Sequence, residues 1–254
     1  MIIDTHSHIY LAEFDVDRAE MLKRAENEGV KLILMPAIDN QTHSIMMKTE
    51  ADFSGICAAM MGLHPCSVKE DYKNELGIVQ TYFEQRRFVA VGETGLDFYW
   101  DRTFTNEQYE SFQIQIEIAI QYGIPIVIHS RNSIEECIKV IGENQKGNLK
   151  GVFHCFSGNI EQAKQIIDLG FYLGIGGVIT FKNSGLDKVM ENVNVKDVIL
   201  ETDAPYLAPV PFRGKRNECS YLKYVVEKLS EAKNVPIEEI ERITTNNAKD
   251  LFGL

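Results

Sequence analysis

The sequence begins with two histidines that stand two positions apart. The stretch MIIDTHSHIY places His6 and His8 in an apolar, alternating segment that is typical of a β-strand. Residues i and i+2 of a strand point from the same face, so both imidazoles could bind one metal ion. A pair of histidines on a half-exposed strand would give the same pattern without a metal. The pair alone therefore leaves both interpretations open.

Other potential ligands stand in or beside later strands. The chain has six histidines, and five of them lie in or next to an apolar run that predicts a strand: His6, His8, His64, His129 and His154. His43 falls instead in a segment that predicts an exposed helix. Two carboxylates take similar places, since Glu93 ends the run VAVGE and Asp203 ends VILETD. A charged group that follows a buried run must be paired, hydrogen-bonded or bound to a metal.

The pattern along the chain predicts strands that alternate with helices. Runs rich in Val, Ile and Leu predict eight strands, at 2–6, 31–36, 55–62, 88–93, 124–129, 151–155, 171–175 and 198–203. Helix start signals lie between them, in the pairs Thr105 with Gln108, Ser133 with Glu136, and Asn159 with Gln162. Eight such units predict an α/β fold, a (β/α)8 TIM barrel forming a single domain over residues 1–254. A doubly wound open sheet with fewer strands is the alternative.

A barrel would bring the candidate ligands together, because the carboxyl ends of its strands meet at one mouth. Six residues from five predicted strands would gather there: His6, His8, Glu93, His129, His154 and Asp203. Strand alternation places Glu201 on the face of Asp203, and Asp4 on the face of His6, so both are predicted beneath the mouth. There they would either orient a histidine ligand or pair within the barrel. The same alternation predicts that Cys155 faces the helix layer as a small buried residue.

Composition limits the possible partners and compartments. A net charge of −11 argues against a protein that coats duplex nucleic acid through its whole surface. The five cysteines are scattered without a Cys-x-x-Cys pair, which favours a reducing compartment. No basic and apolar leader precedes the first strand, and the apolar runs are too short to span a bilayer. We therefore expect a cytoplasmic protein without a membrane partner, and the sequence does not indicate its oligomeric state.

Five motifs together point to a known family. The stretches DTHSH, VGETGLD, IHSRNS, FHCFSG and ETDAPYLAP resemble, in order and spacing, the motifs of the TatD family of metal-dependent deoxyribonucleases, which are amidohydrolase-like barrels. The resemblance runs from Asp4 to the stretch RGKRNE at 213–218. Three positions depart from the family pattern, with Asn132 in place of Asp, Phe212 in place of His, and Cys219 in place of Pro. None is a predicted ligand, so they bear on substrate preference.

The resemblance implies a site for two divalent cations, which could be Mg²⁺, Mn²⁺ or Zn²⁺. His6, His8 and Asp203 resemble the ligands of one cation, and His129 and His154 those of the second. Glu93 resembles the carboxylate that bridges the two cations. The implied activity is hydrolysis of DNA phosphodiester bonds by a metal-activated water, exonucleolytic on single-stranded ends or 3′ ends. In this interpretation Asp203 also accepts the proton of the attacking water.

An acidic chain that binds DNA needs local positive charge. Arg213, in the stretch PFRGKRNE, is the first candidate for a phosphate contact, and Lys182, Arg131 and His64 are further substrate-binding candidates. Each of these could instead be an ordinary surface residue. The aromatic run 98–100 at the same mouth could stack on bases or cap the barrel.

Two other functions fit the same residues. The metal-dependent barrel also hosts lactonases and cyclic amidases, which act on small carbonyl substrates. A non-catalytic binding protein could keep the barrel as a scaffold. The basic stretch after the last strand favours phosphodiesters over carbonyl substrates, and the full ligand set favours an enzyme.

Overall fold

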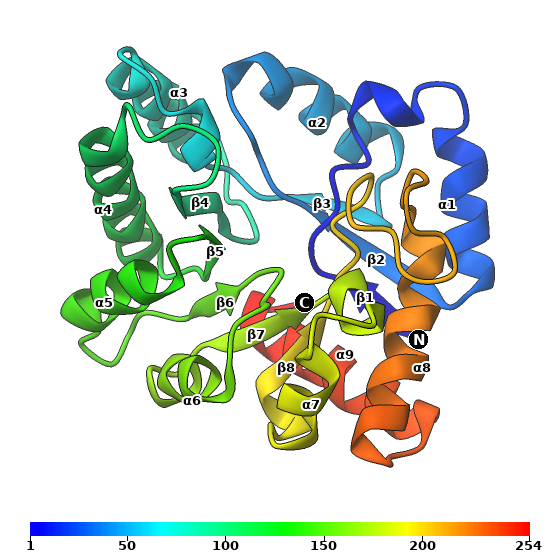
Figure 1. Ribbon diagram of the computed structural model, residues 1–254. Coiled ribbons are helices and arrows are strands. Elements are labelled where there is room, and N and C mark those ends of the chain that lie inside the picture. Colours follow the sequence, from blue (N-terminus) through cyan, green and yellow to red (C-terminus); the bar gives the residue numbers. More distant parts are fainter.

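The computed structural model describes residues 1–254 and forms a barrel of eight parallel strands (Figure 1). The strands are β1 (Ile2–Asp4), β2 (Val30–Met35), β3 (Cys57–Ala59), β4 (Val91–Asp97), β5 (Ile126–Arg131), β6 (Gly151–Phe153), β7 (Tyr172–Ile175) and β8 (Val198–Leu200). The helices are α1 (Arg18–Asn27), α2 (Asn40–Asp52), α3 (Tyr72–Gln85), α4 (Thr105–Tyr122), α5 (Ile134–Asn144), α6 (Ile160–Asp168), α7 (Leu186–Glu191), α8 (Leu222–Lys233) and α9 (Ile237–Phe252). The predicted (β/α)8 barrel is confirmed. None of its helices combines the length and apolar character needed to cross a membrane.

Two parallel sheets close into a ring through short backbone contacts. One sheet has the order β1-β2-β3 and the other β4-β5-β6-β7-β8. A bridge between Met61 and Val91 joins β3 to β4. At the other seam the Thr5 N–H donates to the Leu200 carbonyl oxygen at 3.0 Å, and a bridge pairs Ser7 with Ala204. Closure removes the sheet edges and brings β1, with its histidines, next to the end of β8.

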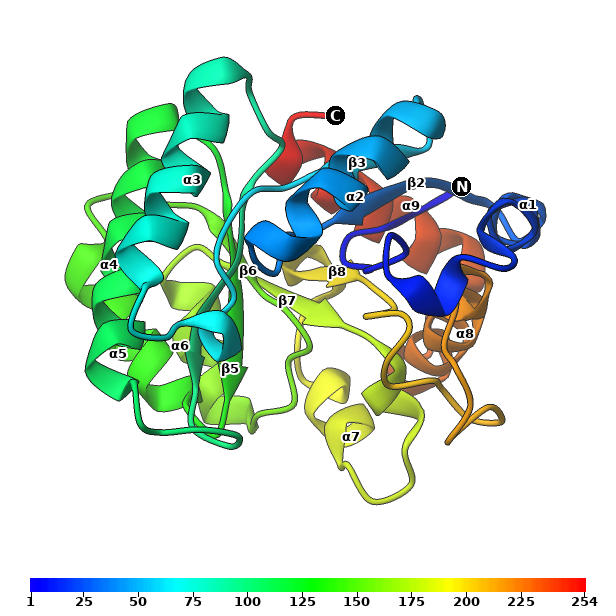
Figure 2. The same ribbon diagram turned by 90° about the horizontal axis from the view of Figure 1, so that it is seen from above.

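Helix α9 closes the barrel at the end opposite the functional residues. An apolar cluster takes one side chain from each strand or its immediate flank and joins them to α9: Ile3, Leu34, Met60, Ala90, Val127, Val152, Tyr172, Ile199, Ala248, Leu251 and Phe252. Figure 2 shows α9 and the C-terminus at one end of the strands, with α7 and the loop before it at the other. Apolar side chains therefore fill the barrel interior at the end covered by α9, and only the mouth at the carboxyl ends of the strands is open to a ligand.

Two predicted strand ends were placed too early. Strand β4 continues past Glu93 to Asp97, and β5 continues past His129 to Arg131. Both ligand candidates therefore lie inside strands, where pairing between β4 and β5 holds their backbones. The prediction that His43 lies exposed is also wrong, because its ring is buried on α2, with Nε2 3.3 Å from the Gly62 carbonyl oxygen.

Only one of the three predicted helix start signals forms a capping box. Asn159 and Gln162 exchange hydrogen bonds of 2.9 Å at the start of α6. Ser133 instead donates to the Leu96 carbonyl oxygen at 2.6 Å, and the amide oxygen of Gln108 accepts from the Asp97 N–H at 2.9 Å. These two side chains bond to the backbone of β4 instead of capping a helix, and both support the strand that carries Glu93.

The closing role of α9 can be tested at its last residue. Replacing the buried Phe252 with Ala should lower the free energy of unfolding by about 3 kcal/mol, because it opens a cavity beneath the barrel interior. Leu254→Ala is the control, since this side chain is 43% exposed and should cost less than about 0.5 kcal/mol. Urea unfolding followed by circular dichroism measures both, and equal values would contradict the role given to α9.

Candidate metal centre

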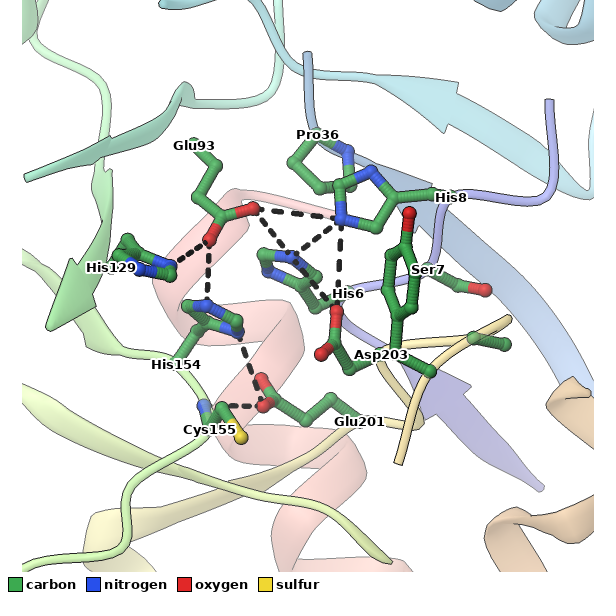
Figure 3. Close-up of polar contacts among 12 residues, drawn as sticks. His6, Ser7, His8, Pro36, Glu93, His129, His154, Cys155, Glu201 and Asp203 are labelled. Carbon is green, nitrogen blue, oxygen red and sulfur yellow. Dashed lines mark hydrogen bonds and ion pairs between the residues drawn. The ribbon is translucent and has the colours of Figure 1, made fainter. Parts of the chain in front are cut away.

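The carboxylate of Glu93 lies at the centre of the barrel mouth, surrounded by imidazoles (Figure 3). It is only 2% exposed. Five ring nitrogens approach its oxygens within 3.5 Å, and they come from His6, His8, His64, His129 and His154. The structure therefore brings together all six ligand candidates named from the sequence and adds His64 to them.

One half of the site faces Glu93 Oε2. The Nε2 atoms of His6 and His8 lie 3.3 Å apart, and they are 3.1 and 3.5 Å from Glu93 Oε2. Asp203 Oδ1 lies 3.7 Å from His6 Nε2 and 3.6 Å from His8 Nε2. Two imidazole nitrogens and two carboxylate oxygens thus point at one small volume.

The other half of the site faces Glu93 Oε1. His129 Nδ1 and His154 Nε2 each lie 2.7 Å from this oxygen, and His64 Nε2 lies 3.4 Å from it. The Cys66 N–H donates to His64 Nδ1 at 3.0 Å, so in the neutral ring the proton is on Nε2. His64 is therefore placed as a hydrogen-bond donor at the centre, whereas His129 and His154 are free to present lone pairs.

The donor set fits divalent cations. Three groups of ligand atoms each lie within 4.8 Å of one another: His6 with His8 and Asp203, His6 with Glu93 and His154, and His64 with Glu93 and His129. Imidazole nitrogen and carboxylate oxygen are ligands for Zn²⁺ and Mn²⁺, and for Mg²⁺ where waters complete its shell. Although burial opposes the charge, Glu93 and Glu201 raise the pKa of His154 well above its ordinary value, so the carboxylates favour positive charge at this position.

Asp203 is another buried group of the site whose charge needs a partner. Burial raises the pKa of its carboxyl group to about 7. Its backbone has φ 57°, a left-handed conformation that Asp adopts more readily than most residues. The turn at Asp203 allows its N–H to donate to the His6 carbonyl oxygen at 2.9 Å, which holds the end of β8 against β1.

A cavity of about 950 Å³ opens above the imidazoles. Of the four substrate-binding candidates, His64, Arg131 and Arg213 line it and Lys182 does not. Lys215, two positions after Arg213, lines the cavity as a third cationic side chain. The guanidinium of Arg216 points elsewhere, where it pairs with Asp17 at 2.6 Å. The prediction for Lys182 is therefore not supported by its position.

A family model described as "TatD related DNase" matches residues 3–253. The chain belongs to the TatD family. It is 38% identical over 255 residues to the uncharacterized metal-dependent hydrolase YabD of Bacillus subtilis, and the match covers 100% of both chains. The uncharacterized metal-dependent hydrolase YcfH of Escherichia coli is 31% identical over 259 residues, covering 100% of this chain and 96% of YcfH.

A solved structure agrees with this assignment. The crystal structure of YjjV, a TatD homologue from Escherichia coli, superposes with a TM-score of 0.94 at 30% identity, covering 100% of this chain and 98% of YjjV. The chain is thus a metal-dependent hydrolase of the TatD family. Its imidazole and carboxylate cluster is the part of this TatD barrel with the chemistry to hold the metal.

Three ligands of this TatD centre are oriented by a second polar group. Tyr10 O–H donates to the Pro36 carbonyl oxygen at 2.7 Å, so its oxygen accepts from His8 Nδ1 at 3.0 Å and leaves Nε2 with the lone pair. Asp97 Oδ2 accepts from His129 Nε2 at 2.8 Å, which leaves Nδ1 facing Glu93. Although burial alone would raise it, hydrogen bonds from His129 and from the backbone hold the pKa of Asp97 well below its usual value.

Sequence reasoning missed Tyr10 and Asp97 as parts of the site. Tyr10 follows His8 at the same i, i+2 spacing that joins His6 and His8, and this spacing was the available signal. Asp97 was not considered as a site residue because β4 was predicted to end at Glu93, four residues too early.

Glu201 is the third orienting group. Its Oε1 lies 3.4 Å from His154 Nδ1 and accepts from the Cys155 N–H at 2.5 Å (Figure 3). Gly174 makes room for it, because a Cβ there would lie 2.5 Å from Glu201 Oε2. A side chain at position 174 would displace the carboxylate that supports His154.

Asp4 and Cys155 do not lie where strand alternation placed them. Strand β1 ends at Asp4, so strand alternation does not continue to His6, and Ile3 takes the interior position. The Asp4 carboxylate instead accepts from Thr202 Oγ1 at 2.6 Å and from the His6 N–H at 3.3 Å, so it closes the seam between β1 and β8. Cys155 has φ 47° just beyond β6, and this turn directs it into the cavity rather than into the helix layer.

The contact between Tyr10 and His8 can be tested in the metal-free protein. Tyr10→Phe removes the acceptor for His8 Nδ1, and metal affinity should fall by about 10- to 100-fold. Isothermal titration with Zn²⁺ or Mn²⁺ measures the affinity directly. Tyr122→Phe is the control, because this side chain lies on α4 and lines no part of the cavity. An unchanged affinity in Tyr10→Phe would show that the hydrogen bond does not orient the ligand.

Proposed function

We propose that this TatD protein hydrolyses phosphodiester bonds of DNA, exonucleolytically at single-stranded ends, with two divalent cations. The observation that supports this most strongly is that the ligand cluster and the cationic side chains share one cavity. Arg131, Arg213 and Lys215 line this cavity although the chain has a net charge of −11. Positive charge collected beside a metal centre suits a phosphodiester and has no evident use for a neutral lactone or cyclic amide.

Bound divalent cations would supply Lewis-acid stabilisation of the charge that develops on the phosphoryl oxygens. His6, His8 and Asp203 would help to hold one cation, His129 and His154 the other, and Glu93 would take part in holding both. Asp203 lies at the edge of the cluster, where its carboxylate accepts the proton of the attacking water. His64, which lines the cavity with its Nε2–H, donates a hydrogen bond to a phosphate oxygen.

The role of Asp203 gives the first test. Asp203→Asn should lower kcat on end-labelled single-stranded DNA by about 10³-fold while the protein still binds substantial metal, because Asn can ligate but cannot accept the proton. The assay is run with Mg²⁺, Mn²⁺ and Zn²⁺, and metal content is measured by mass spectrometry. His129→Ala is the comparison variant, which should lose metal and activity together. An active Asn variant would remove Asp203 from this role.

The same assay distinguishes the substrate classes. Wild-type protein is compared on single-stranded DNA, lactones and cyclic amides. Turnover of a lactone or cyclic amide with inert DNA would replace the nuclease proposal by a carbonyl hydrolase.

Substrate binding is tested at two cationic side chains, one that lines the cavity and one that does not. Arg213→Ala should raise KM for DNA about tenfold, the usual effect of losing a hydrogen bond to a charged group. Lys182→Ala should leave KM within about twofold, since Lys182 does not line the cavity. Steady-state kinetics at fixed ionic strength measures both variants. Equal effects would mean that the cavity does not define where the phosphates bind.

A further inference from the structure

Two exposed aromatic side chains stand at the rim of the cavity. Tyr99 is 52% exposed and Trp100 is 68% exposed, although most large apolar side chains of the chain are buried. Their rings meet edge to face with centroids 4.9 Å apart. They lie three and four positions after Leu96, just beyond the end of β4. Trp100 lines the cavity. Exposing two large aromatic rings to water is unfavourable, which suggests that they bind a ligand.

A cation is stacked on this aromatic pair. The guanidinium carbon of Arg131 lies 3.9 Å from the Tyr99 ring centroid and 5.2 Å from that of Trp100. Arg131 ends β5, two residues after His129, and lines the same cavity. The three side chains thus offer an aromatic surface and a positive charge together.

The position of this surface is fixed relative to the metal centre by Asp97. Its Oδ1 accepts from the Tyr99 N–H at 2.9 Å and from the Trp100 N–H at 3.1 Å. Its Oδ2 accepts from His129 Nε2 at 2.8 Å, and Gln108 holds its backbone N–H. One buried carboxylate therefore sets both a ligand of the metal centre and the turn that carries the aromatic rings.

We propose that Trp100 and Tyr99, with Arg131, form a stacking subsite for one unpaired nucleobase of the strand whose phosphodiester lies at the metal centre. The inference rests on the proposed nuclease function and names the part of the substrate that the rim recognises. Every base offers a flat π-face, so stacking binds single strands without selecting a sequence. A base inside a duplex is already stacked and cannot use the subsite, which gives the preference for unpaired ends a structural basis.

Another aromatic ring that lines the cavity is covered by a cation. Arg213 lies over the ring of Phe181, with its guanidinium carbon 3.7 Å from the ring centroid, so this aromatic face is already covered. Arg213 and Phe181 both line the cavity. Charge for the phosphates therefore dominates beside Phe181, whereas Trp100, which is 68% exposed and 5.2 Å from the Arg131 guanidinium carbon, keeps a more open aromatic face.

Trp100 is the only tryptophan of the chain, so its fluorescence reports on the subsite directly. Asp203→Asn protein with Mg²⁺ is titrated with a short single-stranded oligonucleotide, which binds without being turned over. A series of oligonucleotides carries a single abasic residue at each position in turn. We expect quenching by the intact strand and loss of quenching when one particular base is missing. Quenching that is absent, or that does not depend on any base, overturns the proposal.

A kinetic cycle then tests contact between Trp100 and that base. Trp100→Ala should raise KM for the intact strand about tenfold, and removal of the base should do the same for the wild-type protein. Combined, the two changes should raise KM by no more than either alone, because they break one interaction. Trp100→Phe should restore most of the affinity. Independent, multiplying effects would show that Trp100 does not contact the base.

Controls separate this inference from the function on which it rests. Arg102→Ala is the matched control, since its guanidinium lies over Phe98 in the same loop but does not line the cavity, and KM should stay within twofold. Thermal unfolding of Trp100→Ala checks that the exposed side chain is not needed for folding. If wild-type protein cleaves no DNA, the nuclease proposal falls and takes the subsite with it. If it cleaves DNA but the two changes act independently, only the subsite is lost.

Discussion

Burial of one negative charge constrains the whole barrel mouth. The Glu93 carboxylate is 2% exposed and lies inside a protein whose interior would strongly disfavour an isolated charge. Although burial alone would raise it, the surrounding histidines hold the pKa of Glu93 well below its usual value. That compensation works only while imidazoles from four different strand ends or loops remain within hydrogen-bond distance, as His6, His64, His129 and His154 do. The closure of the barrel is therefore a condition for the ionised centre, because an open seam between β1 and β8 would separate these groups.

Precision at the centre comes from pairs of groups that belong to neighbouring strands. His129 on β5 is oriented by Asp97 at the end of β4, and His154 after β6 by Glu201 after β8, across Gly174 on β7. Each histidine thus has one nitrogen beside a carboxylate and the other directed at Glu93. Such partners fix the tautomer and the ring orientation, which a metal ligand needs before the ion arrives. Asp97 and Glu201 thus hold the ligand rings in place relative to the strands without being predicted ligands.

The sequence predicted the architecture and the ligands because both follow from local rules. Apolar runs alternating with amphipathic helices identified all eight strands, and the rule that functional groups gather at the carboxyl-end mouth of a barrel identified Glu93, His129 and Asp203. Errors arose where a tertiary contact overrode such a rule. Strand β1 ends at Asp4, so the alternation that was to place Asp4 beneath His6 stops there, and the left-handed turn at Cys155 reversed the direction of that side chain. Lys182 and Lys215 could not be ranked from the sequence, because only the path of the loops decides which of them reaches the cavity.

The proposed nuclease function requires an acidic protein to act on a polyanion, and the distribution of charge limits how it could do so. With a net charge of −11, the surface as a whole repels DNA, and three cationic side chains in one cavity can neutralise only a few phosphates. Long-range attraction therefore contributes little, and binding must depend on contacts made inside the cavity at short range. The proposed metal centre for one phosphodiester and the proposed stacking surface for one base would supply such contacts, and both would require the strand to end or to be unpaired locally. The same acidic surface would discourage binding along intact duplex, so the proposed preference for free ends would follow from what the protein repels as well as from what it binds.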